Sequence, residues 1–385
     1  MTLRFGLPLL AMGLAAIGVL SGAAAADPKR RVSAPLQHGN LSIFLIHGAS
    51  APGPVPLTLQ EALAKGTVEV LETGKVSELK IRNTGDEPVF VQMGDIVKGG
   101  RQDRVLTLSM LLEPKSGDVP VGAYCVEQGR WSARGKEDAR RFALSEAMMP
   151  SREAKVALAR THAANDAAAP ALRTAPSQRT DGRTTSGLTA NIIREQRRAD
   201  IQVQRRGSDG QGEVWRSVAK VQRELSANLT ASVASERSRT SLQLSLENEA
   251  LKKAQGEFLA ALEPAGLEAD DVVGVVVAVD GKLSTADLYP SNGLFRKMWP
   301  KLVRAAVTEA LAAGKGSQGS APPAASPAPG VPAVEAFLAS ADAGKAHSRA
   351  IGSVAQLETR DTDKAIKVEA RSTKGALLHT NFVAK

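Results

Sequence analysis

The first third of the chain alternates short apolar runs with clusters of turn residues, the pattern of closely spaced β-strands. Turn residues at 83–86 favour a hairpin between two of these runs, 76–81 and 88–92. One helix interrupts the series, because residues 59–65 follow a threonine cap and carry the glutamate of a capping box. Strands at such short spacing indicate a mainly antiparallel sheet. The runs expected as strands are 41–47, 68–71, 76–81, 88–92, 105–112 and 119–126.

Helical periodicity replaces this pattern in residues 137–262, where apolar positions recur every three or four residues. Residues 163–187 interrupt it, because they hold few large apolar side chains and many Ala, Thr, Ser, Arg and Pro. That composition favours a mobile loop. The expected helices are 137–148, 188–206, 213–229 and 242–262.

The C-terminal third returns to strands. The β-branched run 272–279 ends in an Asp-Gly turn and is expected to pair with 283–289 as a hairpin. A helix capped by Ser291 or Asn292 then carries one broad apolar face. Residues 313–333 are rich in Gly, Ser, Pro and Ala, which predicts a flexible linker. Further strands are expected at 354–358, 365–370 and 376–383.

Residues 1–26 have the pattern of an export signal: a basic position, an apolar core, and small residues before Asp27. We therefore expect cleavage near Asp27 and a periplasmic or secreted protein. The mature chain has no other long apolar run, so we expect no transmembrane segment in it. Residues 27–383 are expected to form a single elaborated α+β domain. It would have a mainly antiparallel β-sheet core, packed helices and a helical, partly disordered middle section.

Much of the net charge of +9 comes from residues 151–240, which hold sixteen Lys and Arg against nine Asp and Glu. Such a segment can contact an acidic envelope polymer, or it can be a solvated, arginine-rich helical face. Nucleic acid is not an expected partner, because Trp215 is the only aromatic residue there and single-strand binders need stacking platforms. The five histidines match no metal-ligand spacing, so we expect neither a metal nor a cofactor.

Unusual polar residues gather at 92–104, where Gly99 and Gly100 permit a turn with positive φ and close approach of a ligand. Two arginines, an amide and a carboxylate follow directly, at Arg101, Gln102, Asp103 and Arg104. In an extended segment, Gln102 and Arg104 would face away from the other two. Such arginines suit a planar, bidentate site for phosphate or carboxylate. The alternative is a strand-end turn whose arginines pair with acids for structure.

A second group of polar residues lies at 125–131, where Cys125 and Glu127 would share one face of a strand. Cys125 is the only cysteine, so the chain forms no internal disulfide. It is either a nucleophilic thiol or a buried structural residue. The neighbouring carboxylate favours the structural alternative, because a negative charge raises the pKa of a thiol.

Three other side chains complete the candidate site. Glu127 and Arg130 are its polar residues in the second segment, and Trp131 either covers the site or packs against the protein. His379 lies in an expected C-terminal strand that could bring it beside residues 92–104, although a hydrogen-bonded sheet histidine is the commoner case.

These motifs resemble the uncharacterised bacterial domain family named for its association with ADP-ribosylglycohydrolase and rhodanese-phosphatase proteins. The resemblance covers most of residues 41–383 and implies only a genomic association with ADP-ribose or phosphate chemistry. The export signal, the arginine-rich loop and the Pro/Ala linker depart from it and argue against a cytoplasmic role in nucleotide metabolism. The segments that carry the resemblance are Gly94 with 99–104, 125–131, 211–215, 273–281, 294–295 with Trp299 and Leu302, and 378–379.

The leading hypothesis is an exported protein that binds a polar or anionic small molecule or a sugar at a site built from 94–104 and 125–131. A hydrolase of a phosphate-like, ADP-ribose-like or glycosidic substrate is the alternative, with Glu127 or Asp103 as general base. A third hypothesis is an envelope interaction protein that uses residues 151–240. The expected ligand-binding residues are Gly99, Gly100, Arg101, Gln102, Arg104, Arg130 and Trp131.

Overall fold

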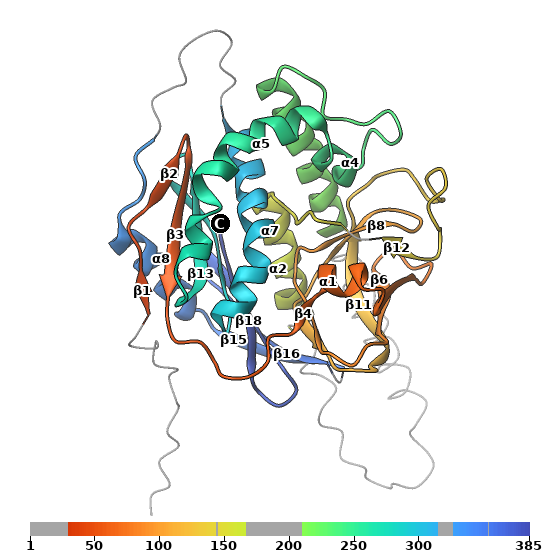
Figure 1. Cartoon of the computed structure of the whole chain (residues 1–385), viewed down its shortest axis with the longest axis horizontal. Helices are drawn as coiled ribbons and strands as arrows, with labels where there is room; N and C mark the ends of the chain where they lie inside the picture. The colour runs from red at the N-terminus through yellow and green to blue at the C-terminus, as the bar shows by residue number, and fades with distance from the viewer. Residues whose placement is uncertain (1–29, 144, 167–209, 315–325, 353) are drawn as a thin grey trace, which may run out of the picture.

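The computed structural model describes residues 30–143, 145–166, 210–314, 326–352 and 354–385. Within these residues the strands form three sheets flanked by helices (Figure 1). Antiparallel pairing dominates, and among the described strands one pair, β4 (Leu57–Thr58) with β7 (Val89–Val91), is parallel. The α+β fold with a mainly antiparallel sheet core is therefore confirmed.

β13 (Val272–Val279) lies inside a nine-stranded sheet, because all its residues are apolar or glycine and all are buried. A strand of this kind needs cover on both faces. It pairs with β3 (Leu41–His47) on one side and β14 (Lys282–Leu288) on the other, so the predicted hairpin is confirmed. The remaining strands are β1 (Arg31–Val32), β2 (Leu36–His38), β15 (Ala346–Ile351), β16 (Ala355–Asp361), β17 (Ala365–Arg371) and β18 (Leu377–Ala384).

Helices cover both faces of this sheet (Figure 1). α7 (Asn292–Ala313) packs its apolar side on β13, and the hydroxyl of Ser291 caps its first turn. α8 (Val331–Asp342) covers the opposite face. α2 (Arg152–Asp166) packs on the strands at the C-terminal end of the sheet. The other helices are α4 (Leu242–Leu246), α5 (Glu249–Leu262), α6 (Ala265–Glu268) and a helix over 210–228.

Two smaller sheets form a near-barrel beside the large sheet. Their further strands are β5 (Val68–Glu72), β6 (Glu78–Asn83), β8 (Ile96–Gly99), β9 (Arg104–Leu106), β10 (Met110–Leu112), β11 (Gly117–Cys125) and β12 (Phe142–Ala143). The six-stranded sheet has the order β12-β8-β9-β11-β6-β5, and the three-stranded sheet has the order β10-β7-β4. Apolar side chains from both sheets meet in one core. α1 (Leu59–Ala64) lies against it and begins with the expected capping box.

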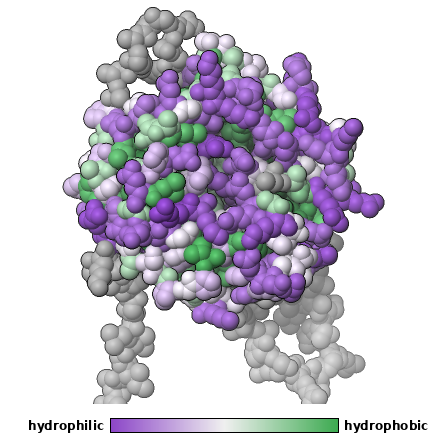
Figure 2. Space-filling view, in the orientation of Figure 1, coloured by the Kyte–Doolittle hydropathy of each residue, from purple (hydrophilic) through white to green (hydrophobic). Residues whose placement is uncertain are grey.

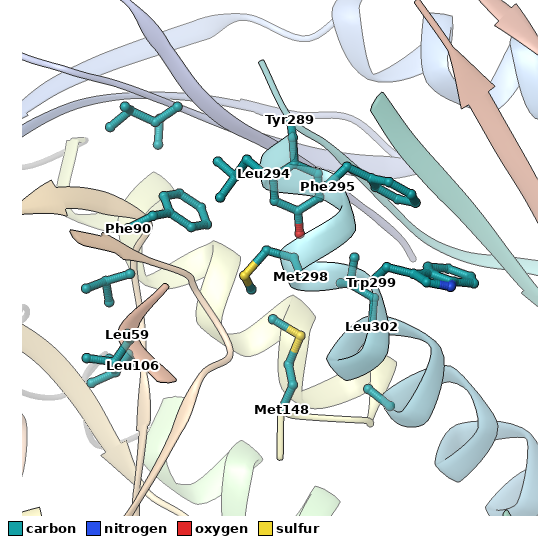
Figure 3. Packing of buried hydrophobic residues seen from close by; sticks show 14 of the residues in the cluster. Leu59, Phe90, Leu106, Met148, Tyr289, Leu294, Phe295, Met298, Trp299 and Leu302 are labelled. Carbon is teal, nitrogen blue, oxygen red and sulfur yellow. The ribbon is translucent and has the colours of Figure 1, made fainter. Parts of the chain in front are cut away.

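One hydrophobic core joins the near-barrel to the large sheet (Figure 3). Phe295 and Trp299 of α7 stack with their ring centroids 5.6 Å apart. Tyr289, which follows β14, lies edge-on to Phe90 of β7 at 6.2 Å. Full burial of one large apolar side chain stabilises a fold by roughly 1.5–3 kcal/mol. The shared core therefore ties the two parts of the molecule together.

The surface is mainly hydrophilic on the face shown in Figure 2, with hydrophobic residues in small separate groups. Among the described residues, the exposed large hydrophobic side chains are Val76 and Trp131, at 44% and 40% exposure. No helix in the described ranges is long and apolar enough to cross a membrane.

The structure corrects three expectations for the near-barrel. The described part of 137–148 contains bends, isolated bridges and β12 in place of a helix, because pairing with β8 overrides the local helical pattern. The run 105–112 is divided between β9 and β10, which lie in different sheets. The hairpin expected between 76–81 and 88–92 is wrong, because β6 pairs with β5 and β11 whereas β7 pairs with β4 and β10.

The helices differ from expectation mainly at their ends. The helix expected at 213–229 is confirmed over 210–228, and the one expected at 242–262 is divided into α4 and α5. α8 was not expected, and its first residues overlap the linker predicted at 313–333. β15 was not expected either, since its residues alternate only weakly between apolar and polar.

Four expected segments lie wholly or mainly outside the described residues. These are the export signal at 1–26, the helix at 188–206, most of the linker at 313–333 and most of the loop at 163–187. For residues 163–166, the first four positions of the loop at 163–187, the expectation is wrong, because α2 continues through Asp166.

Candidate functional site

Strand pairing brings the two polar segments of the sequence together. β9 lies between β8 and β11, so Arg104 is opposite Val97 on one side and opposite Cys125 on the other. The segments 94–104 and 125–131 are therefore neighbours, as the two-part site requires.

A tight glycine turn connects β8 to β9. Gly99 and Gly100 have φ values of +111° and +53°, in the region that favours glycine. A Cβ atom at Gly100 would lie 2.3 Å from the ring of Phe142, so the turn also needs glycine for space. Residues 100–103 are not extended, which overturns the expected alternation of side chains. Of the four residues that follow the glycines, Arg101 is partly exposed and Gln102, Asp103 and Arg104 are buried.

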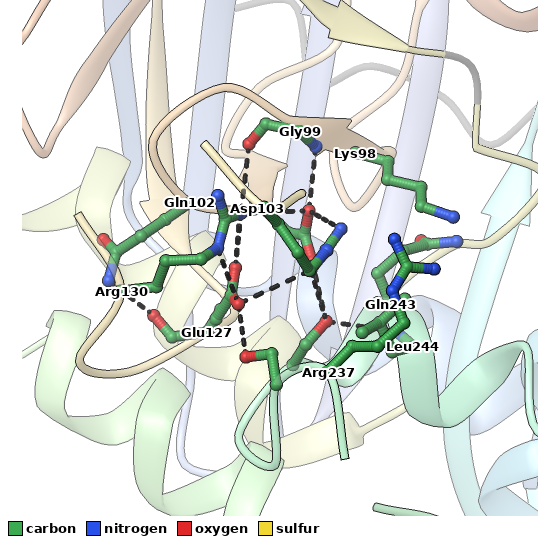
Figure 4. A network of polar contacts seen from close by, with 12 residues as sticks. Lys98, Gly99, Gln102, Asp103, Glu127, Arg130, Arg237, Gln243 and Leu244 are labelled. Atoms are coloured by element: carbon green, nitrogen blue, oxygen red, sulfur yellow. Dashed lines mark hydrogen bonds and ion pairs between the residues drawn. The ribbon is translucent and has the colours of Figure 1, made fainter. Parts of the chain in front are cut away.

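Two buried carboxylates and two guanidinium groups form the centre of this region (Figure 4). Asp103 and Glu127 are both fully buried. Arg134 binds Asp103 in a bidentate manner, with Nη1–Oδ2 and Nη2–Oδ1 distances of 3.0 and 3.2 Å. Arg130 binds Glu127 in the same manner, with Nε–Oε1 and Nη2–Oε2 distances of 2.8 and 2.6 Å. Buried charges persist only when they are paired in this way.

Hydrogen bonds occupy all four carboxylate oxygens. Asp103 also accepts from the backbone N–H of Gly99 at 2.8 Å and from the hydroxyl of Ser241 at 2.7 Å. Glu127 also accepts from the hydroxyl of Ser238 and, at 3.2 Å, from the backbone N–H of Asp103. The network therefore joins the glycine turn, the second segment and the loop before α4.

The ionisation of Glu127 follows from these contacts. Burial raises the pKa of its carboxyl, but hydrogen bonds from Arg130, Ser238 and the backbone of Asp103 outweigh burial and hold the pKa below the ordinary value. A general base near neutral pH needs a pKa close to the working pH and access to a substrate proton. In this arrangement Glu127 has neither property.

Arg104 lies at the edge of the network and is more loosely paired. Its Nη1 donates to the carbonyl of Gln102 at 2.8 Å, and its Nη2 lies 3.4 Å from Oε2 of Glu72. Its Nε atom is buried and has no hydrogen-bond partner among the described residues. The guanidinium groups of Arg104 and Arg101 lie 5.4 and 5.5 Å from the centroid of the Trp131 ring. This cation–π arrangement reaches solvent through Trp131, which is 40% exposed, and through the partly exposed Arg101, whereas Arg104 is buried.

Gln102 and Cys125 have structural contacts. The Gln102 side chain donates to the backbone carbonyl of Glu127 at 2.9 Å. The backbone N–H and carbonyl of Cys125 are both bound by the side chain of Gln211, at 2.8 and 2.9 Å. Burial is the main reason that the pKa of the Cys125 thiol rises to about 11, with Arg104 opposing it. The thiol is therefore protonated at neutral pH, as the structural alternative expects.

His379 lies beside the start of the first segment, outside the carboxylate network. Its Nε2 is 3.0 Å from Oδ1 of Asp287, and its Nδ1 is 3.0 Å from the hydroxyl of Ser109. That hydroxyl accepts from the backbone N–H of Met93, and the Gln92 side chain lies 3.4 Å from Asp287. His379 is thus a hydrogen-bonded sheet histidine that links the large sheet to the near-barrel.

Several partners in the network were not expected from the sequence. Arg134 lies between the second segment and the helix expected at 137–148, Glu137 is the first residue of that expected helix, and Ser238 and Ser241 lie in the loop before α4. The one local signal was the charge spacing of Arg134 and Glu137, which form an ion pair at 3.0 Å. Glu72 gave no signal, because it ends an ordinary strand.

No group of three or more His, Cys, Asp and Glu side chains among the described residues is placed to hold a metal ion. Comparison with curated proteins and with solved structures found no match. The family model of the ARPP-1 domain, the ARG and Rhodanese-Phosphatase-superfamily-associated Protein domain, matches residues 29–383. Since this match covers almost the whole chain, the protein belongs to the ARPP-1 domain family.

Proposed function

We propose that this protein binds a polar, anionic small molecule or a sugar at the solvent edge of the two segments, where Arg101 and Arg104 flank Trp131. The observation that carries the proposal is the pair of guanidinium groups over one tryptophan that is 40% exposed. The buried Nε of Arg104, which lacks a partner among the described residues, supports it. A donor left without a partner gains most when a ligand reaches it.

The chemistry of this edge suits such a ligand. Arginine recognises phosphate and carboxylate through planar, paired hydrogen bonds, and tryptophan offers a flat apolar face for a sugar ring. Arg101 is partly exposed, so we expect a ligand to reach it directly. Arg104 is fully buried with its guanidinium 5.4 Å from the Trp131 ring, so we expect a ligand to reach it by displacing that ring. The carboxylate network behind them fixes the backbone that carries both arginines.

Two other hypotheses gain no support from this geometry. Hydrolysis by Glu127 or Asp103 would require a carboxylate to leave its guanidinium partners, and all its oxygens are occupied. Envelope association concerns residues 151–240, of which 167–209 lie outside the described residues. It remains a prediction, and its test is salt-sensitive surface association that is lost when residues 163–206 are deleted.

Export is part of the proposal and rests on the signal pattern of residues 1–26. N-terminal sequencing of the protein recovered from a periplasmic or secreted fraction should begin near Asp27. A chain that retains Met1 in the cytoplasmic fraction would contradict it.

The binding test is a thermal-shift screen of phosphosugars, nucleotides and acidic saccharides, followed by calorimetry on any compound that stabilises the protein. We expect Arg101→Gln and Trp131→Ala each to weaken binding about tenfold, since each removes one contact of roughly 1–1.5 kcal/mol. Arg349→Gln is the matched control, because this arginine is exposed on β15. A flat screen, or equal affinities for all three variants, would count against the proposal.

A further inference from the structure

A cation-rich cleft lies between α2, the helix over 210–228 and the end of β18. Its volume is about 400 Å³, which is within the usual range for small-molecule sites. Apolar side chains Val156 and Ala384 contribute to its wall. Five basic residues line it against two acidic ones, and none belongs to the Arg101–Trp131 site. The charged lining residues are Arg152, Arg160, Arg216, Lys220, Lys385, Glu153 and Glu213.

Among the described residues, the two lysines that line this cleft form ion pairs with carboxylates and the three arginines do not. Lys220 pairs with Glu153 at 2.8 Å, and Lys385 pairs with Asp361. Within the described ranges, no carboxylate forms an ion pair with any of the three arginines of the lining. Arg160 and Arg216 are exposed, on facing helices. Unpaired arginines that line one cleft provide the fork-shaped donors that a phosphate group accepts.

A second, smaller chamber adjoins the first. Its volume is about 210 Å³, and it shares Arg152, Glu153 and Lys220 with the larger chamber. Its inner wall carries Ser284 and Glu309, joined by a hydrogen bond of 2.7 Å from the serine hydroxyl to Oε1.

The second oxygen of Glu309, Oε2, is buried and has no hydrogen-bond partner among the described residues. Burial raises the pKa of this carboxyl, which favours the neutral form that can donate a hydrogen bond. An unpartnered buried polar atom is costly unless a further group occupies the site. A hydroxyl group on a ligand can both donate and accept, so it suits the pair formed by Ser284 and Glu309.

We propose that this two-chamber cleft binds a phosphate monoester of a hydroxyl-rich small molecule. The phosphate lies against Arg152, Arg160 and Arg216, and a hydroxyl group reaches Ser284 and Glu309. The proposal is independent of the Arg101–Trp131 site, because the two share no lining residue.

The test is isothermal calorimetry of the full mature chain with three probes: inorganic phosphate, glucose 6-phosphate and glucose. We expect glucose 6-phosphate to bind more tightly than phosphate, and glucose alone not to bind. The double variant Arg160→Gln/Arg216→Gln should weaken both phosphorylated probes by tenfold or more, since each charge-assisted contact contributes about 1.5 kcal/mol or more. Ser284→Ala should weaken glucose 6-phosphate and leave phosphate unchanged.

Two controls make the result specific. Arg349→Gln removes an exposed positive charge elsewhere and should change neither affinity. Affinities that fall in Arg101→Gln but not in the double variant would assign the probes to the site at Trp131 instead, so failure here and failure of that site are distinguishable. Equal affinities for phosphate and glucose 6-phosphate would overturn the role of the inner chamber. Absence of binding at millimolar concentration, or binding that survives the double variant, would overturn the cleft as the site.

Discussion

At the scale of single residues, the stability of the candidate site depends on how its buried charged side chains are paired. Asp103, Glu127, Arg130 and Arg134 are charged groups at no more than 11% side-chain exposure. Each is stable there only because its partners are in place, so removing one partner costs more than losing a hydrogen bond. The sequence located three of these four residues, because they lie in two compact motifs. Arg134 lay three residues beyond the second motif in a segment without a clear pattern.

Arg134→Met should therefore strongly destabilise the protein. It leaves the buried Asp103 carboxylate without its bidentate partner, and we expect a loss of about 3–5 kcal/mol in the free energy of unfolding. Urea unfolding followed by circular dichroism measures it. Arg237→Met is the control, because this arginine is 61% exposed and its ion pair with Glu137 is long, at 4.0 Å. This substitution should lower the free energy of unfolding by less than about 0.5 kcal/mol. Similar small losses in both variants would contradict the account of the network.

The lowered pKa of Glu127 predicts how stability depends on pH. A carboxyl whose pKa is lower in the folded state stabilises the fold fully above its unfolded pKa, and this contribution is lost as pH falls through the folded pKa. The stability difference between wild type and Glu127→Gln should therefore be constant above about pH 5 and shrink below it. Glu249→Gln, at an exposed position, is the control and should cost little stability at neutral pH. A difference that grows on acidification would refute the prediction.

At the scale of elements, local patterns predicted most of the longer strands, though not β15, and where the hairpin of β13 and β14 turns. They failed on pairing partners in the near-barrel. The turn at 83–86 does follow β6, and the Asn83 side chain donates both to the carbonyl of Glu87 across this turn and to that of Glu113, at 2.8 and 3.1 Å. β6 therefore meets β11, whose register begins opposite Asn83. Non-local contacts of this kind carry no signal in a single sequence.

Substitution of Gly100 tests whether the turn between β8 and β9 holds the candidate site in place. Gly100→Ala faces both a φ of +53° and a contact of 2.3 Å with Phe142. Gly135 is a matched control, since its φ is +60° and nothing lies within 4 Å of the added carbon. Gly135→Ala should cost about 1 kcal/mol, and Gly100→Ala should cost a further 1–3 kcal/mol or so. The extra loss should diminish in a Phe142→Ala background. Equal costs at both glycines would show that the ring is not the constraint.

At the scale of the whole molecule, the sequence predicted one α+β domain but not how its parts are joined. The joints are residues that are distant in sequence. Asp95 in the first segment binds Lys301 of α7 at 2.6 Å, and both are buried. His379 connects Asp287 to Ser109 in the same manner. Because these joints are polar and buried, the near-barrel cannot separate from the large sheet without exposing unpaired charge.

The near-barrel and the large sheet should therefore unfold as one cooperative unit. The three tryptophans make this measurable, since Trp131 reports on the near-barrel edge and Trp299 on α7. One variant keeps Trp131 as its only tryptophan, and a second keeps only Trp299. In each variant the other two tryptophans are replaced by phenylalanine. Within each variant, the urea midpoints from fluorescence and from circular dichroism should coincide. Lys301→Met should lower both midpoints together, because Asp95 loses its partner and the strain is shared by both parts. A Trp131 transition that precedes the dichroism transition would instead show a near-barrel that unfolds separately, and the joints at Asp95 and His379 would then be too weak to couple it to the large sheet.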